Sequence, residues 1–220
     1  MFTISELLDL SHSAAGDYLQ QFAYPWQALD GIHDLILSLG TELGEDYLQI
    51  KPQVWVHNTA VVAPTAYLGS PCIVGPQTEV RHCAFIRGSA LIGQGCVVGN
   101  STEIKNAILF DGVQVPHFNY VGDSILGYRS HMGAGAVTSN VKSDKTPIRA
   151  HLEQDVIETG RLKFGAVLSD FAEVGCNSVL NPGTIVGRCS SIYPTSCVRG
   201  FVPADSIFKN SGEIVKTSKV

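Results

Sequence analysis

Residues 56–104 read VHNTAVVAPTAYLGSPCIVGPQTEVRHCAFIRGSALIGQGCVVGNSTEI, and an aliphatic residue returns at every sixth position of this stretch. A helix repeats its buried face every 3.6 residues and a strand alternates every two, so neither sustains a period of six over this length. Three six-residue units close a triangular coil of eighteen residues, and stacked coils enclose the aliphatic anchors. The stretch therefore predicts a mainly β chain folded as a parallel β-helix of hexapeptide repeats.

The repeat occurs in two runs, and a small residue stands four positions after most anchors. The anchors of the first run are Val56, Val62, Leu68, Val74, Val80, Ile86, Ile92, Val98 and Ile104, and those of the second are Leu162, Leu168, Val174, Leu180, Val186, Ile192 and Val198. A β-sandwich would place turn signals every 8 to 12 residues instead of every six, so the solenoid is the preferred interpretation.

Segments outside the repeat complete the predicted domain organisation. Residues 1–50 are expected to form a helical cap, since Thr3 and Glu6 make a capping-box pattern and an amphipathic run from Trp26 to Leu39 ends at Gly40. Residues 51–208 form the β-helix, and the polar stretch at about 141–161 is a loop insert because the repeat vanishes there. Residues 209–220 are a tail.

Composition and charge exclude several classes of partner. The net charge of −5 provides no basic field for nucleic acid or an anionic membrane. No run of 18 apolar residues and no secretory signal is present, so we expect a cytoplasmic protein. The six cysteines form no C-x-x-C pair and no zinc-type spacing with histidine, and a reducing compartment disfavours disulfides.

The repeat shortens at two places around the stretch VPHFNYVGDSILG, residues 115–127. The step from Ile104 to the next anchor is five residues, and so is the step that begins at Val121. A solenoid that lacks a residue must kink its corner there, and core packing does not explain His117 and Tyr120 in this region. Irregular segments on a rigid scaffold often carry function, so we expect a site here.

A longer pattern carries a resemblance to a known family. It comprises Lys105, His117-x-x-Tyr120-x-Gly122-Asp123, Gly133-Ala134-Gly135 and Asn140. It resembles the acetyltransferase domain of the bifunctional enzymes that make UDP-N-acetylglucosamine, and more closely the acetyltransferase tail of two-domain sugar-1-phosphate nucleotidylyltransferases. The resemblance spans roughly residues 70–208. It implies a left-handed β-helix and, because no nucleotidyltransferase domain precedes the repeat, no nucleotidyl transfer.

The resemblance also implies an N-acetyltransferase that uses acetyl-CoA as co-substrate, needs no metal, acts on an amino sugar phosphate such as glucosamine-1-phosphate, and works as a homotrimer. His117 corresponds to the general base, a role that suits a side chain with a pKa near neutrality. The implied substrate-binding residues are Arg87, Lys105, Tyr120, His131 and Asn140, and the implied cofactor-binding residues are Ala134, Cys176 and Pro194. The small turn at residues 133–135 is expected to present backbone N–H groups to an oxyanion.

Three departures from the family pattern put the acceptor sugar in question. His131 replaces an asparagine, Val141 replaces a tyrosine, and Thr146 stands where a loop lysine is expected, with Lys145 or Arg149 as candidate replacements. A different amino sugar phosphate, or a nucleotide-linked amino sugar, is therefore an open alternative acceptor.

Two other function classes stay open. A zinc enzyme like the γ-class carbonic anhydrases would need three convergent histidines such as His82, His117 and His131, but the chain lacks their short histidine pair. A non-catalytic β-helix that binds a sugar nucleotide or scaffolds another enzyme is the second alternative.

Overall fold

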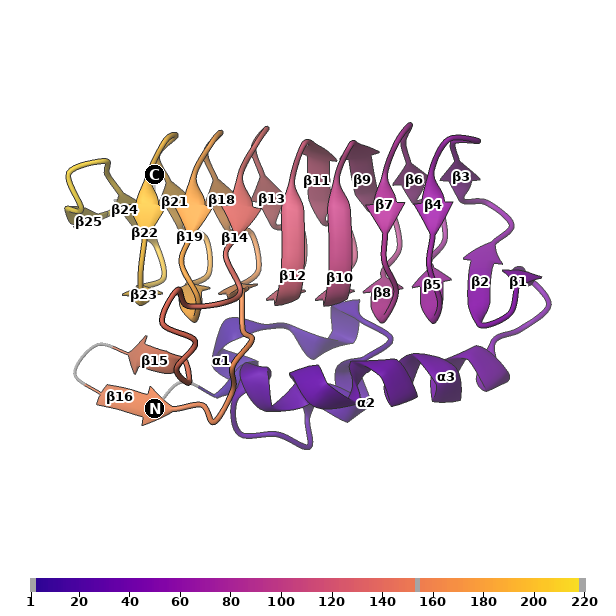
Figure 1. Cartoon of the computed structure of the whole chain (residues 1–220), viewed down its shortest axis with the longest axis horizontal. Helices are drawn as coiled ribbons and strands as arrows, with labels where there is room; N and C mark the ends of the chain where they lie inside the picture. The colour runs from indigo at the N-terminus through magenta and orange to yellow at the C-terminus, as the bar shows by residue number, and fades with distance from the viewer. Residues whose placement is uncertain (1–2, 153–154, 218–220) are drawn as a thin grey trace.

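The chain folds as a left-handed triangular β-helix with a helical segment along one flank (Figure 1). The computed structural model describes residues 3–152 and 155–217. Successive strands run up the back, over the top, down the front and along the bottom of Figure 1 while the chain advances along the axis. The fold class and the handedness implied by the resemblance are therefore confirmed.

Three faces make up the prism. The back face consists of β3 (Val61–Val62), β6 (Glu79–Val80), β9 (Val97–Asn100), β11 (Gln114–His117), β13 (His131–Met132), β18 (Glu173–Val174), β21 (Ser191–Ile192) and β24 (Ser206–Phe208). The front face consists of β4 (Tyr67–Leu68), β7 (Phe85–Ile86), β14 (Val137–Thr138), β19 (Val179–Leu180) and β22 (Cys197–Val198), with the first halves of β10 (Glu103–Leu109) and β12 (Tyr120–Leu126). The lower face consists of β2 (Val54–His57), β5 (Cys72–Val74), β8 (Ala90–Ile92), β17 (Ala166–Leu168), β20 (Thr184–Val186) and β23 (Phe201–Val202), with the second halves of β10 and β12.

The aliphatic anchors fill the interior as the period of six predicts. From Leu68 to Ile104 and from Leu168 to Val198 they are buried, because each points inward from its short strand. Leu162 is an exception, since its side chain is 58% exposed. The prediction for Leu162 was wrong: the insert has not yet rejoined the coil at this residue, and the interior positions resume in β17.

The two five-residue steps coincide with the long strands β10 and β12. Each strand turns the corner between the front and lower faces without a loop, and a single residue in the left-handed region makes the turn: Asn106 at φ 48° and Asp123 at φ 49°. Asparagine and aspartate tolerate this region better than most residues. His117 and Tyr120 lie between the two shortened corners and on neither of them. The shortening of the repeat therefore shapes the corners of Asn106 and Asp123 and not the position of His117.

Both ends of the solenoid carry an antiparallel strand. β1 (Tyr47–Lys51) pairs with β2 at the first coil, and β25 (Ile214–Lys216) pairs with β24 at the last. The antiparallel partners cover strand edges that would otherwise offer unpaired backbone groups to another chain. Part of the predicted tail is therefore a strand in the described structure.

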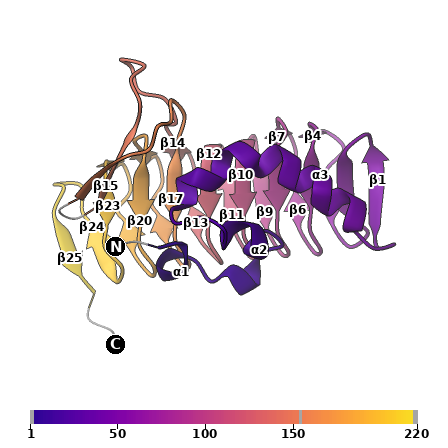
Figure 2. The ribbon, with the colours of Figure 1, turned by 90° about the horizontal axis from the view of Figure 1, so that it is seen from below.

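The N-terminal segment packs along the lower face instead of over the end of the prism (Figure 2). It contains α1 (Ile4–Leu7), η1 (Leu10–His12), α2 (Gly16–Leu19), η2 (Pro25–Gly31) and α3 (Ile32–Glu42). The capping box at Thr3 is present, with the Glu6 carboxylate accepting the Thr3 N–H at 2.6 Å. The predicted end at Gly40 was wrong, because α3 continues to Glu42 and Gly40 lies where a Cβ atom would come within 2.3 Å of the Trp55 ring.

The insert leaves the prism after β14 and forms a small antiparallel hairpin of β15 (Arg149–Leu152) and β16 (Asp155–Glu158). Figure 1 places this hairpin below the prism, beside the helical segment. Residues 153 and 154 of the predicted insert lie outside the described residues. Among the described helices, none has the length and apolar content to cross a membrane.

Candidate active site

Four of the predicted site residues stand in one row along the corner between the back and front faces. They are His117, Ala134, Cys176 and Pro194. The backbone N–H that follows each of the last three donates to the carbonyl of the member one coil earlier, at 3.0, 2.9 and 2.8 Å. Neighbouring coils of a β-sheet lie about 4.8 Å apart, so the row is about 14 Å long. The structure thus lines up the implied base and the implied cofactor residues along the axis of the prism.

His117 is exposed at the start of this row, on the last residue of β11. Its backbone N–H donates to Asn119 Oδ1 at 3.1 Å. Asn119 is buried, and its Nδ2 donates to the carbonyls of Gly133 and Ala136 at 2.8 and 3.1 Å. The imidazole has no hydrogen-bond partner in the part of the chain that the structure describes, so a rigid corner presents a free ring to an incoming group.

The turn at residues 133–135 offers one backbone donor. The N–H groups of Gly133 and Gly135 are engaged with the carbonyls of Val174 and His117, at 2.7 and 3.0 Å. The N–H of Ala134 has no acceptor among residues 3–152 and 155–217. In the turn that is expected to bind an oxyanion, the backbone N–H group of Ala134 is therefore the one that is available.

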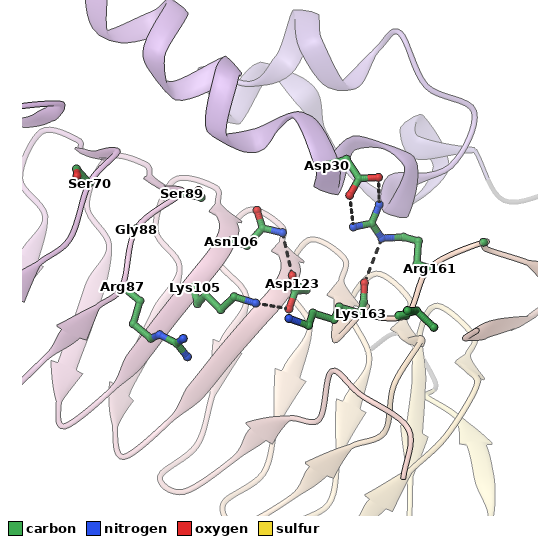
Figure 3. A pocket seen from close by; sticks show the side chains of 12 residues that line it. Asp30, Ser70, Arg87, Gly88, Ser89, Lys105, Asn106, Asp123, Arg161 and Lys163 are labelled. Atoms are coloured by element: carbon green, nitrogen blue, oxygen red, sulfur yellow. Dashed lines mark hydrogen bonds and ion pairs between the residues drawn. The ribbon is translucent and has the colours of Figure 1, made fainter. Parts of the chain in front are cut away.

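A cleft of about 630 Å³ lies at the corner between the front and lower faces (Figure 3). Arg87 and Lys105 line it, together with Asp123, so the two cations among the implied substrate-binding residues are brought together. Arg87 donates to Glu103 Oε1 at 2.9 Å, and this pairing raises the pKa of the guanidinium. Arg87 therefore enters the cleft fully charged.

Asp123 is the organising residue of this corner, although it was not among the predicted site residues. Its side chain is 4% exposed and accepts from Lys105 Nζ at 3.0 Å, from Asn140 Nδ2 at 2.5 Å and from Asn106 Nδ2 at 2.9 Å. A buried carboxylate needs such donors to offset its lost hydration. The second five-residue step, from Val121 to Leu126, could have pointed to Asp123 in the sequence. At this shortened corner the aspartate side chain turns toward the coils on either side.

Tyr120 joins the same group from the front face. The position of Gly122 leaves room for it, because a Cβ atom there would lie 2.5 Å from the tyrosine oxygen. Burial raises the pKa of Tyr120, and the carboxylates of Asp123 and Glu103 add to this effect, while Arg87 and a hydrogen bond with Asn140 oppose it. Tyr120 is thus a neutral hydrogen-bonding group between the row and the cleft.

His131 does not join this group within one chain. It lies on β13 of the back face, where its Nδ1 is 2.8 Å from Glu173 Oε2, and it lines a separate hollow of about 720 Å³. The implied sugar contact at His131 therefore has no geometric support from the single chain.

The two candidate replacements for the loop lysine, Lys145 and Arg149, do not line the cleft either. Arg149 pairs with Glu158 at 2.7 Å and borders another hollow of about 430 Å³. Thr146 binds Asp144 in the same loop, at 2.9 Å. Arg161 and Lys163, which were not among the predicted site residues, enter the cleft from the returning end of the insert.

The structure also bears on the predicted absence of disulfides and on the zinc-site alternative. All six cysteines are free thiols. His82 lies on the same corner as His117 but two coils earlier, with Asn100 between them, so the two imidazoles belong to positions about 10 Å apart. No group of three or more His, Cys, Asp or Glu side chains in the described residues is arranged to hold a metal ion.

Comparisons with known proteins agree with the resemblance. A family model described as the GMPPB C-terminal domain matches residues 70–152. The bifunctional sugar-1-phosphate nucleotidylyltransferase/acetyltransferase of Sulfurisphaera tokodaii is 26% identical over 196 residues, which cover 87% of this chain and 49% of that protein. The bifunctional protein GlmU of Methanococcus aeolicus is 29% identical over 114 residues, or 51% of this chain and 28% of that protein.

Among solved structures, PerB from Caulobacter crescentus in complex with CoA and GDP-perosamine is similar at a TM-score of 0.41 and 15% identity, over 73% of this chain and 56% of that one. The chain spans about half the length of the Sulfurisphaera tokodaii relative. The predicted resemblance to bifunctional nucleotidylyltransferase/acetyltransferases is confirmed for that part of their length.

Proposed function

We propose that the protein is an N-acyltransferase that transfers an acetyl group from acetyl-CoA to the amine of an amino sugar phosphate. The observation that carries this proposal is the row that begins at His117 and runs along one corner, with a cationic cleft on the adjoining face. A row of small residues suits an extended thioester arm, and paired cations suit a phosphoryl group. The similarity to proteins named as acetyltransferases supports the same reaction.

In the proposed reaction the amine nitrogen attacks the thioester carbonyl and a C–N bond forms. His117 accepts the proton that the amine loses, since its imidazole is free and exposed. The carbonyl oxygen becomes an oxyanion that the Ala134 N–H stabilises. The C–S bond then breaks, and the CoA sulfur leaves and takes up a proton. No side chain becomes acylated, so Cys176 acts as a groove residue and not as a nucleophile.

The acceptor lies across the front face in this proposal. Arg87 and Lys105 bind its phosphoryl group in the cleft, and Tyr120 and Asn140 contact the sugar between the cleft and His117. Acetyl-CoA is a co-substrate and no metal takes part. The resemblance names glucosamine-1-phosphate as the first acceptor to test.

We further propose that the working form is a homotrimer with its sites between neighbouring prisms. Tyr67 and Phe85 expose large aromatic surfaces on the front face, 55% and 44% of each residue, which a second copy would cover. A neighbouring copy would also have to supply His131, because that residue faces away from the cleft of its own chain. The expected mass is three times the 23.6 kDa of one chain, measured by light scattering.

The test is thiol release from acetyl-CoA with glucosamine-1-phosphate and other amino sugar phosphates as acceptors. Replacing His117 by Ala is expected to lower kcat by about 10²- to 10⁴-fold, the usual contribution of a general base. The matched control is His82→Ala, on the same corner two coils away, which should leave kcat unchanged. Full turnover of His117→Ala would refute the mechanism. Binding of a sugar phosphate without turnover on any amine would instead favour the non-catalytic sugar-nucleotide-binding or scaffolding alternative.

A further inference from the structure

The returning end of the insert forms one wall of the cleft, opposite the strands of the prism. Residues 160–163 line this wall, and Arg87 and Lys105 line the other. Figure 3 shows the Lys163 side chain reaching into the cleft toward Lys105 and Asp123. A segment that lies forty residues after Asp123 in the sequence therefore adds a third cation to the group already described.

Lys163 is an unpaired cation in this position. No carboxylate lies within 4.0 Å of its ammonium group among the described residues. Asp123, the carboxylate of the prism that lines the cleft, is already engaged with three donors. Arg87, Lys105 and Arg161 are each paired with a carboxylate, so Lys163 leaves the cleft with an excess of positive charge, which favours binding of a negatively charged group.

The backbone of Lys163 is fixed on both sides. Before it, Arg161 is 11% exposed and makes two contacts with the Asp30 carboxylate, at 2.6 and 2.7 Å, while its Nε donates to the Lys163 carbonyl at 3.1 Å. After it, Phe164 is fully buried and its N–H donates to the Asn140 carbonyl at 3.0 Å. Lys163 is thus held between two anchored neighbours, although its own side chain is exposed.

One of these anchors belongs to the N-terminal segment. Asp30 lies in η2, and its side chain is 85% exposed; its pair with Arg161 ties the insert to this segment at the cleft, next to the ring contact between Trp26 of η2 and Phe164. A bidentate arginine–carboxylate pair fixes orientation as well as distance. The Asp30–Arg161 pair therefore sets where the wall with Lys163 stands.

From these contacts we propose that Lys163 is a third phosphate-binding residue of the cleft and that Asp30 and Arg161 are the positioning residues that hold it over Lys105. The inference rests on the proposed function for the identity of the acceptor and extends it to residues outside the β-helix repeat. It also gives the N-terminal segment a role at the site, because Asp30 supplies one of the contacts that hold this wall of the cleft in place.

Binding measurements test the role of Lys163 without requiring turnover. Calorimetry with glucosamine-1-phosphate on the full-length protein is expected to give a Kd about tenfold higher for Lys163→Met than for the wild type, because one charge-assisted contact is lost. Lys209→Met is the control, since it removes a partly exposed lysine at the far end of the prism and outside the cleft, and it should leave Kd unchanged. An unchanged Kd in Lys163→Met, or no binding of glucosamine-1-phosphate by the wild type, would overturn the inference.

The positioning role needs a second comparison. Asp30→Asn is expected to raise Kd about threefold in the wild type, the scale of a partly exposed ion pair, and Asp30→Glu should restore part of the loss. In the Lys163→Met background the same change should have no effect, because the side chain that it positions is gone. An equal effect in both backgrounds would show that Asp30 acts on stability alone and would refute the positioning role.

These outcomes separate this inference from the proposed reaction. If binding depends on Lys163 but the protein transfers no acetyl group, the cleft is a phosphate-binding site and the proposed acetyltransferase reaction is rejected. Turnover that depends on His117 with binding that ignores Lys163 would keep the enzyme and reject this inference.

Discussion

Replacing Asp123 by Asn is expected to lower the free energy of unfolding by about 3 kcal/mol. Asparagine adopts the positive φ of this corner as readily as aspartate does, so the substitution changes the charge and hydrogen bonding but not the backbone. The side chain is 4% exposed, and all three of its partners, Lys105, Asn106 and Asn140, act as donors. An amide at this position must turn its own NH₂ group toward at least one of these donors.

The magnitude follows from two losses. The charge-assisted bond from Lys105, whose side chain is 23% exposed, is worth about 1.5 to 3 kcal/mol. One buried donor left without an acceptor costs about 1 to 3 kcal/mol more. The sum is reduced because the remaining amide oxygen still accepts, which leaves about 3 kcal/mol. For a chain of this length that corresponds to a fall of about 6 to 12 °C in Tm.

Urea unfolding followed by circular dichroism, together with thermal melts, measures the change. The control is Glu103→Gln on the same strand as Lys105, because the pair of Glu103 with Arg87 is exposed and should contribute little to stability. A loss of less than about 1 kcal/mol in Asp123→Asn would refute the view that this carboxylate organises the corner. An equal loss in Glu103→Gln would refute it as well, because the effect would then not depend on burial.

Three further outcomes follow from other parts of the molecule. Gly40→Val should lower Tm by at least 5 °C, in the range of overpacked cores, because the new side chain would collide with Trp55; a mutant that melts like the wild type would contradict this packing. Burial raises the thiol pKa of Cys72 and Cys96 to about 12, so neither should react with iodoacetamide at pH 8 until urea unfolds the chain, and the stability that these thiols contribute should be lost only as the pH rises from 9 toward 12. Acetyl-CoA should slow alkylation of the exposed Cys176 selectively over the exposed Cys189, which lies on another corner between β20 and β21, as read by mass spectrometry; equal protection of the two thiols would argue against a cofactor groove along the row.

The period of six was sufficient to predict the fold and most of its interior. The anchors between Leu68 and Ile104 are buried because a prism can place every sixth residue inside and has no other way to satisfy such a repeat. The prediction failed at Leu162 and at Gly40 for the same reason: each position depends on what packs against it. Leu162 faces the cleft beside the helical segment, and Gly40 gives way to the ring of Trp55.

The sequence also predicted one part of the candidate site and missed another. The motif around His117 gave the row with Ala134, Cys176 and Pro194, because residues at corresponding places in successive coils must stack. The role of Asp123 was missed, although the shortened step at its corner was visible in the sequence.

By itself, then, the sequence determined a hexapeptide prism, its three faces and the residues that share a corner, because a strict repeat converts spacing along the chain directly into position in space. Only the tertiary structure decided that the N-terminal segment lies along the flank, that His131 faces away from the cleft, and that Lys163 enters it. These residues lie outside the repeat or on another face, and where they meet is fixed by long-range contacts such as the pair between Asp30 and Arg161, which no local pattern encodes.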